Sequence, residues 1–120
     1  MSHNFDAVDE LIKQFSLDRD WDQFHSPKNL ILALVSEVGE LSEVALWKSD
    51  KDLEVYLSSK QGREKISEEI ADVAIYLMRL CQKIDVDLLE IIKAKMGSNM
   101  AKYPVDKSKG NSKKYTELDK

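Results

Sequence analysis

The sequence predicts an all-α protein, a bundle of four helices without a sheet. Apolar residues recur at helical spacing in four segments, and no stretch longer than a few residues alternates with period two. The 120 residues include only 4 glycines and 2 prolines, too few for an all-β chain built on many tight turns. Hydrophobic residues make up 42%, enough for one globular domain.

The first two predicted helices are separated by a polar segment. Residues 6–15 have apolar side chains at helical spacing, and residues 18–25 interrupt that pattern and are expected to form a loop. Ser26 and Pro27 then indicate a helix start, because Ser caps helix N-termini and Pro suits the first helical position. We expect the second helix to run to about Lys48.

The last two predicted helices follow a polar connection. Residues 49–62 are expected to hold a short helical turn and a loop. A third helix is predicted over residues 63–84. Asp85 is a candidate cap for the fourth helix, over residues 86–103, and Pro104 would end that helix.

Composition changes near the end of the chain and restricts the class of partner. The formal charge is −4, yet residues 102–120 contain six Lys against three acidic residues. We therefore predict a helical domain over residues 1–104 and a basic, flexible tail over residues 105–120.

The acidic charge of the helical domain argues against a nucleic-acid partner, and no apolar run reaches the roughly 18 residues of a membrane span. Since Cys81 is the single cysteine, we expect a cytoplasmic protein without disulfides.

Carboxylates interrupt the apolar faces of two predicted helices. Glu37 lies in the middle of the apolar stripe of the second helix, and Glu40 lies on its edge. Glu69 and Asp72 take the corresponding places in the third helix. No Lys or Arg lies within either stripe to neutralise them, and burying unpaired carboxylates is costly. Because hard oxygens select Mg²⁺, Mn²⁺ or Ca²⁺, these four acids predict a divalent-cation site.

The four acids have other possible interpretations besides a divalent-cation site. Ordinary solvated charge is an alternative, since 33% of the residues are charged and acid-x-x-acid spacings then arise by chance. A di-iron bundle fits the sequence less well, because it uses Glu-x-x-His pairs and neither His3 nor His25 follows a Glu by three residues. The isolated glycines form neither a calcium-binding loop nor a phosphate-binding loop.

Two tryptophans flank the second predicted helix. Trp21 lies in the preceding loop and Trp47 lies at the helix end. A half-exposed Trp is a good platform on which a nucleotide base can stack, although both side chains could instead fill the core. Because Mg²⁺ held by a few carboxylates keeps positions for substrate phosphates, the combination favours phosphoanhydride chemistry on a nucleotide.

The acid pairs belong to a pattern that extends over nearly the whole chain. Residues 37–40 (EVGE) and 69–72 (EIAD) resemble the paired acidic motif of the all-α nucleotide pyrophosphohydrolases, the MazG-like superfamily. Three further segments are similar to the dCTP pyrophosphatase branch of that superfamily: residues 19–25 (RDWDQFH), 29–41 (NLILALVSEVGEL) and 113–118 (KKYTEL).

The resemblance implies an activity and a set of site residues. It implies Mg²⁺-dependent hydrolysis of dCTP and its 5-substituted analogues to dCMP and pyrophosphate, with Mn²⁺ as a substitute metal. The four acids would bind the metal, and Glu37 or Glu40 would be the candidate general base. Substrate contacts are implied for Trp21, Asp22, Gln23, Phe24, His25, Trp47, Tyr76, Lys95 and Asn99.

The resemblance also implies a homo-oligomer, commonly a tetramer built as a dimer of dimers. The chain departs from the branch at Ile12, because the branch can place a His from this helix near the nucleotide. One alternative is a pyrophosphohydrolase of the same superfamily for another nucleotide. Another is a non-catalytic helical oligomerisation module with structural metal sites. The two tryptophans favour the enzyme, since a structural site needs no aromatic pocket.

Overall fold

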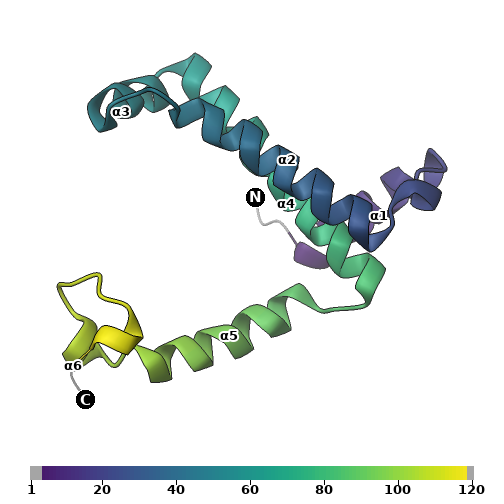
Figure 1. Cartoon of the computed structure of the whole chain (residues 1–120). Helices are drawn as coiled ribbons and strands as arrows, with labels where there is room; N and C mark the ends of the chain where they lie inside the picture. The colour runs from purple at the N-terminus through teal and green to yellow at the C-terminus, as the bar shows by residue number, and fades with distance from the viewer. Residues whose placement is uncertain (1–3, 119–120) are drawn as a thin grey trace. The chain divides into compact units, whose positions relative to one another are not determined.

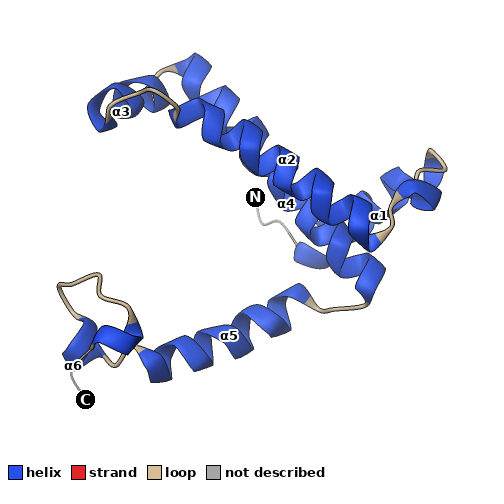
Figure 2. Ribbon diagram, viewed as in Figure 1, coloured by secondary structure: helices blue, strands red, loops and turns tan. Residues whose placement is uncertain are grey.

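The computed structural model describes residues 4–118, and all regular structure in that range is helical (Figures 1 and 2). Two elements, η1 and η2, are short 3₁₀ helices. In chain order the elements are α1 (Phe5–Asp18), η1 (Asp22–Phe24), α2 (Pro27–Ala45), α3 (Asp50–Ser58), α4 (Lys60–Ile84), α5 (Leu88–Lys102), α6 (Val105–Ser108) and η2 (Tyr115–Glu117). The all-α class is confirmed. The number of helices differs from the prediction, because six α-helices lie in the described part of the chain.

Serine residues cap the N-termini of α2, α3 and α4. Ser26 caps α2 as predicted, with its Oγ accepting a hydrogen bond from the amide of Asn29 at 3.1 Å. Ser49 caps α3 and Ser59 caps α4 in the same way. Residues 49–62 therefore form a nine-residue helix and the first turn of α4, where the sequence predicted only a turn and a loop.

Asp85 ends one helix instead of beginning the next. It adopts the left-handed conformation with φ +57°, which ends α4. The cap of α5 is Asp87, whose Oδ1 accepts a hydrogen bond from the amide of Glu90 at 3.0 Å. The predicted cap at Asp85 is thus wrong by two residues, because Asp also tolerates the left-handed backbone that closes a helix.

Helix α4 is the element against which the first half of the chain packs. α2 runs antiparallel beside it, and α1 and α3 also contact it (Figure 1). The buried apolar residues of α2 and α4 are Leu30, Val44, Met78 and Cys81. Cys81 is thus a core residue, as the sequence indicated, and burial raises the pKa of its thiol. At Gly62 a Cβ would lie 1.9 Å from the carbonyl oxygen of Tyr56, so only glycine permits this approach of α3 and α4.

The chain divides into two compact units, with the boundary between Val86 and Asp87. In the second unit, the rings of Tyr103 and Tyr115 meet edge to face with centroids 6.0 Å apart. Leu118 is buried there. The predicted boundary at residue 104 and the flexibility of the tail stay predictions. Among residues 4–118, no helix combines the length and apolarity that crossing a bilayer requires.

Candidate active site

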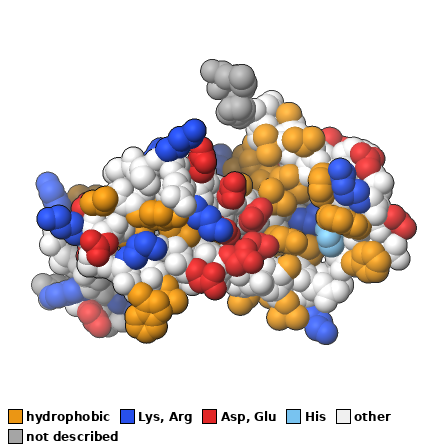
Figure 3. All heavy atoms as spheres, turned by 90° about the horizontal axis from the view of Figure 1, so that it is seen from above, with side chains coloured by type: hydrophobic (Ala, Val, Ile, Leu, Met, Phe, Trp, Pro, Cys, Tyr) orange, Lys and Arg blue, Asp and Glu red, His pale blue; other side chains and the backbone are white. Residues whose placement is uncertain are grey.

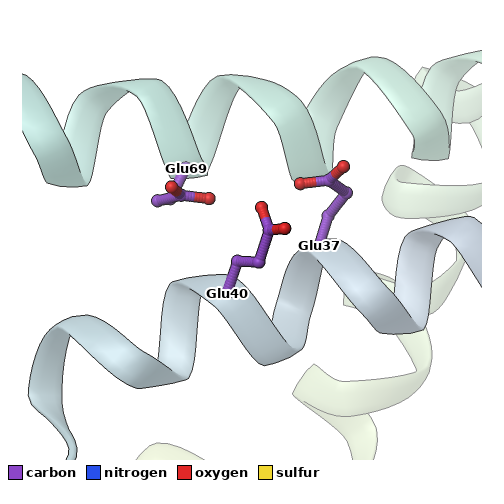
Figure 4. Close-up of side chains that lie close together, drawn as sticks. All are labelled: Glu37, Glu40 and Glu69. Atoms are coloured by element: carbon purple, nitrogen blue, oxygen red, sulfur yellow. The ribbon is translucent and has the colours of Figure 1, made fainter.

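Three carboxylates gather between α2 and α4. Glu37 and Glu40 extend from α2 toward Glu69 on α4 (Figure 4). One oxygen from each lies within 4.8 Å of the others. The i,i+3 spacing places the two α2 side chains on one face, and the antiparallel packing brings α4 opposite that face. Figure 3 shows acidic side chains gathered on one face of the molecule beside hydrophobic ones.

The fourth predicted ligand, Asp72, lies on α4 one turn after Glu69. It is half-buried and is not one of the three carboxylates whose oxygens converge. Its negative charge nevertheless acts on Glu37. The structure therefore brings three of the four predicted acids together and leaves Asp72 at the edge of the group.

Two oxygens of the cluster are buried without a hydrogen-bond partner among the described residues. They are Oε2 of Glu37 and Oε2 of Glu69, and only 5% of Glu69 is exposed. A buried, unpartnered carboxylate oxygen costs free energy unless a cation lies against it. Converging hard oxygens with unsatisfied lone pairs suit a divalent cation, so the residues present fit such an ion.

A lysine that the sequence reasoning missed neutralises part of this charge. Lys65 Nζ lies 2.9 Å from Oε1 of Glu69. The hydrogen bond to Glu69 is the largest cause of the raised pKa of Lys65. Lys65 lies outside the apolar stripe, but its long side chain spans the one turn that separates it from Glu69. The available signal was the i,i+4 spacing of a Lys and a buried Glu.

Glu37 is the acid whose ionisation the cluster opposes most clearly. Burial of the carboxyl is the largest cause that raises its pKa. A hydrogen bond between the protonated carboxyl and Glu40 raises it further, as do the charges of Glu40, Asp72 and Glu69. Metal-free protein therefore holds the ionised form of Glu37 at a cost in stability.

We expect Glu37 to contribute a loss of stability to the metal-free protein as the pH rises above the ordinary Glu pKa of 4.5. A carboxyl whose pKa is higher in the folded than in the unfolded state binds more protons when folded. The free energy of unfolding then falls between the two pKa values and stays reduced above them. Glu37→Gln should remove this contribution, so between pH 4.5 and 7 its melting temperature in EDTA should rise relative to that of the parent.

The matched control for this measurement is Glu43→Gln, which changes an exposed acid on the same helix. Its melting temperature should follow the parent's pH dependence. Equal slopes for all three proteins would show that Glu37 is not the source of the effect.

The segment from Trp21 to His25 presents two kinds of side chain. Trp21 and Phe24 are 46% and 60% exposed, and Gln23 is exposed as well. The Trp21 ring meets the Phe15 ring edge to face at 5.6 Å between centroids. Asp22 and His25 instead hydrogen-bond to Arg79 on α4. The core-filling interpretation is wrong for Trp21, because almost half of its surface is exposed.

Trp47 lies in the connection between α2 and α3 and is 94% exposed. Its backbone has φ +66°, a left-handed conformation that is rare for a bulky residue. The core-filling interpretation is therefore wrong for Trp47 too. A fully exposed Trp on strained backbone contributes little to packing, and such a position is consistent with a role in binding.

The remaining predicted substrate contacts are divided between the two units. Tyr76 is half-buried on α4, one turn after Asp72. Lys95 and Asn99 lie one turn apart on α5 in the second unit. Their roles stay predictions.

Known proteins are similar to this chain in sequence and in fold. The model of the MazG-like family matches residues 32–118. Curated relatives include dCTP pyrophosphatase 1 of Mus musculus, 44% identical over 111 residues, which are 92% of this chain and 65% of the relative. The Homo sapiens protein of the same name is 43% identical over the same shares of the two chains. This chain thus spans about two thirds of the length of these relatives.

A solved structure is also similar to this chain in sequence and fold. The crystal structure of a pyrophosphatase from Archaeoglobus fulgidus is 35% identical, with a TM-score of 0.78. The match covers 87% of this chain and 95% of that one. Because the family model matches most of the residues, including both acidic pairs, this chain belongs to the MazG-like family.

Proposed function

We propose that this protein is a Mg²⁺-dependent pyrophosphohydrolase that converts dCTP, and its 5-substituted analogues, to dCMP and pyrophosphate. The observation that carries the proposal is the carboxylate cluster between α2 and α4, with unpartnered buried oxygens on Glu37 and Glu69. The identity of 43–44% to mammalian proteins named dCTP pyrophosphatase 1 supports the choice of substrate.

The acids have distinct places in this proposal. Glu37, Glu40 and Glu69 would hold Mg²⁺, with Asp72 completing the set and Mn²⁺ as a substitute. A bound divalent cation lowers the pKa of water and offsets the charge of phosphate oxygens. Glu37 is one candidate for the general base that takes the proton of the attacking water. Glu40, which is exposed, is the alternative.

Aromatic and polar residues would hold the rest of the nucleotide. They lie near the ends of α2, on α4 and on α5. The aromatic members can stack on the base, and the polar members can bind the sugar and the phosphates. The proposed contacts are Trp21, Asp22, Gln23, Phe24, His25, Trp47, Tyr76, Lys95 and Asn99.

We expect dCTP and Mg²⁺ to give dCMP and pyrophosphate in equal amounts, without dCDP or orthophosphate. The physical reason is that a carboxylate cluster without a glycine-rich loop offers no cradle for attack at the γ-phosphate. ³¹P NMR of the reaction identifies the products, and EDTA is the control that should stop it.

Orthophosphate from a preparation free of contaminating pyrophosphatase would overturn this reaction class. A parallel survey of the other nucleoside triphosphates ranks the base preference. A clear preference for a different base would keep the reaction and change the substrate.

We further propose a homo-oligomer, a tetramer built as a dimer of dimers. Its support is a group of large apolar side chains that α2 leaves exposed close together, whereas single exposed apolar residues are normal on a monomer. They are Ile31, Leu32, Val35 and Val38. Light scattering after size exclusion should give four times the 13.8 kDa chain mass. A monomeric mass would contradict it.

A cytoplasmic location without a nucleic-acid partner belongs to the same proposal and rests on the single cysteine and the acidic charge.

A further inference from the structure

Arg79 is a cation buried in the first unit, away from the carboxylate cluster. Only 4% of its side chain is exposed. Its Nε donates to Nδ1 of His25 at 3.0 Å, its Nη1 donates to Oε1 of Gln82 at 2.8 Å, and its Nη2 donates to Oδ1 of Asp22. A desolvated guanidinium is stable only where its donors find partners. The segment around η1 is therefore held against α4 by Arg79.

The hydrogen bonds continue from this cation to a third helix. Gln82 Nε2 donates to both the carbonyl oxygen and Oδ1 of Asp9 on α1, each at 2.8 Å. Lys83 Nζ donates to Asp22 Oδ1 at 3.0 Å. Hydrogen bonds from Lys83 and Arg79 hold the pKa of Asp22 below its usual range. Asp22 thus remains ionised and keeps its place in the network at neutral pH.

The bond from Arg79 determines the protonation state of His25. A guanidinium can donate hydrogen bonds but cannot accept them. Nδ1 of His25 must therefore carry a lone pair, which leaves the ring proton on Nε2. The ionisable groups facing the ring are Arg79, Lys83 and Asp22, two cations and one anion. Burial and the charge of Arg79 lower the pKa of His25, so the neutral ring is favoured.

We propose that Arg79 is a positioning residue that holds His25 as the neutral Nε2–H tautomer, so that the ring offers a single N–H donor to an acceptor on the base or sugar of the nucleotide. This inference rests on the proposed function, which places His25 in the substrate pocket. His25 is only partly buried, so part of the side chain is open to a ligand. Asp22 also anchors the loop through its bonds from Arg79 and Lys83.

The tautomer can be measured without any activity. Long-range ¹H–¹⁵N NMR of the imidazole nitrogens distinguishes Nε2–H from Nδ1–H, and His3→Gln assigns the signals because the chain has only two histidines. We expect Nε2–H in the parent at pH 7. Arg79→Met should give a mixture of tautomers and a ring that protonates at higher pH. Arg79→Lys should restore the parent tautomer in part, because an ammonium can also donate to Nδ1.

Gln82→Met is the matched control. It removes one partner of Arg79 but leaves the bond to His25, so the tautomer should not change. Circular dichroism and melting curves check that each variant folds; Lys83 still pairs with Asp22 in Arg79→Met, which favours a folded protein. Nδ1–H or a protonated ring in the parent at pH 7 would overturn the inference even if turnover is normal.

Binding of a non-hydrolysable dCTP analogue tests the donor role. His25→Ala and Arg79→Met should each weaken binding about three- to tenfold, the effect of one hydrogen bond. Analogue affinity that is unchanged in His25→Ala would overturn the donor role while leaving the proposed enzyme intact. A parent protein that fails to turn over any nucleotide with Mg²⁺ would instead refute the proposed function, and the NMR result would be unaffected.

Discussion

Asp72→Asn or Glu40→Gln should abolish Mg²⁺-dependent turnover and leave the metal-free fold intact or more stable. Each change removes a carboxylate that would bind the metal. The loss should exceed the roughly 10–100-fold that removal of a group merely supporting a metal ligand costs. Steady-state rates of pyrophosphate release, measured across Mg²⁺ concentrations, show whether more metal restores activity.

The effect on stability has the opposite sign because like charges repel when no cation separates them. The charges of Glu40 and Asp72 both raise the pKa of Glu37, so neutralising either one relieves repulsion around that carboxyl. In EDTA the melting temperature should therefore be equal to or above the parent's. In excess Mg²⁺ the order should reverse, since a ligand that binds the folded state more tightly stabilises it more, and these variants should bind Mg²⁺ less tightly than the parent.

The control is again Glu43→Gln on the exposed side of α2, which should change neither turnover nor melting. A clear drop in melting temperature in EDTA for both Glu40→Gln and Asp72→Asn would identify these acids as paired structural residues. The metal site would then need other ligands.

Trp47→Ala should weaken nucleotide binding about ten- to a hundredfold, because a stacked base is worth about 1–3 kcal/mol and each 1.4 kcal/mol is a decade in affinity. Mg²⁺ binding should hardly change, since no carboxylate is touched. Glu69→Gln should do the reverse and damage metal-dependent turnover more than nucleotide stacking. Isothermal titration of the dCTP analogue and of Mg²⁺ with both variants gives the comparison.

The backbone at Trp47 supplies a sharper control. Its φ of +66° costs a residue with a side chain about 1–2 kcal/mol, whereas glycine adopts it freely. Trp47→Gly should therefore be as stable as the parent or more so, while losing the stacking platform. Trp47→Phe should keep much of the affinity. If Trp47→Ala binds the analogue as tightly as the parent, Trp47 belongs to an interface and the predicted pocket is misplaced.

Features that depend on a few neighbouring residues were predictable. The start of α2 at Ser26 and Pro27 and the placement of Glu37 and Glu69 on buried helix faces follow from capping and from the 3.6-residue period. The helix α3 was missed because the segment 49–62 is polar and the helix is only nine residues long. A helix this short depends on its packing against α4, which the Ser49 cap alone does not indicate. The prediction that Asp85 caps α5 was wrong because Asp is suited both to the N-cap of a helix and to the left-handed residue that ends one.

The sequence by itself determined the helical class, the two acidic pairs and the membership of a family whose motifs they carry. These are properties of local spacing, which the helix period converts directly into shared faces. Only the tertiary structure decided which carboxylate oxygens are buried without a partner, and that Lys65 pairs with Glu69. It also turned Asp22 and His25 toward Arg79, residues 57 and 54 positions away in the chain. Such pairs arise when helices pack, and burial then makes each charge depend on partners that no local pattern specifies.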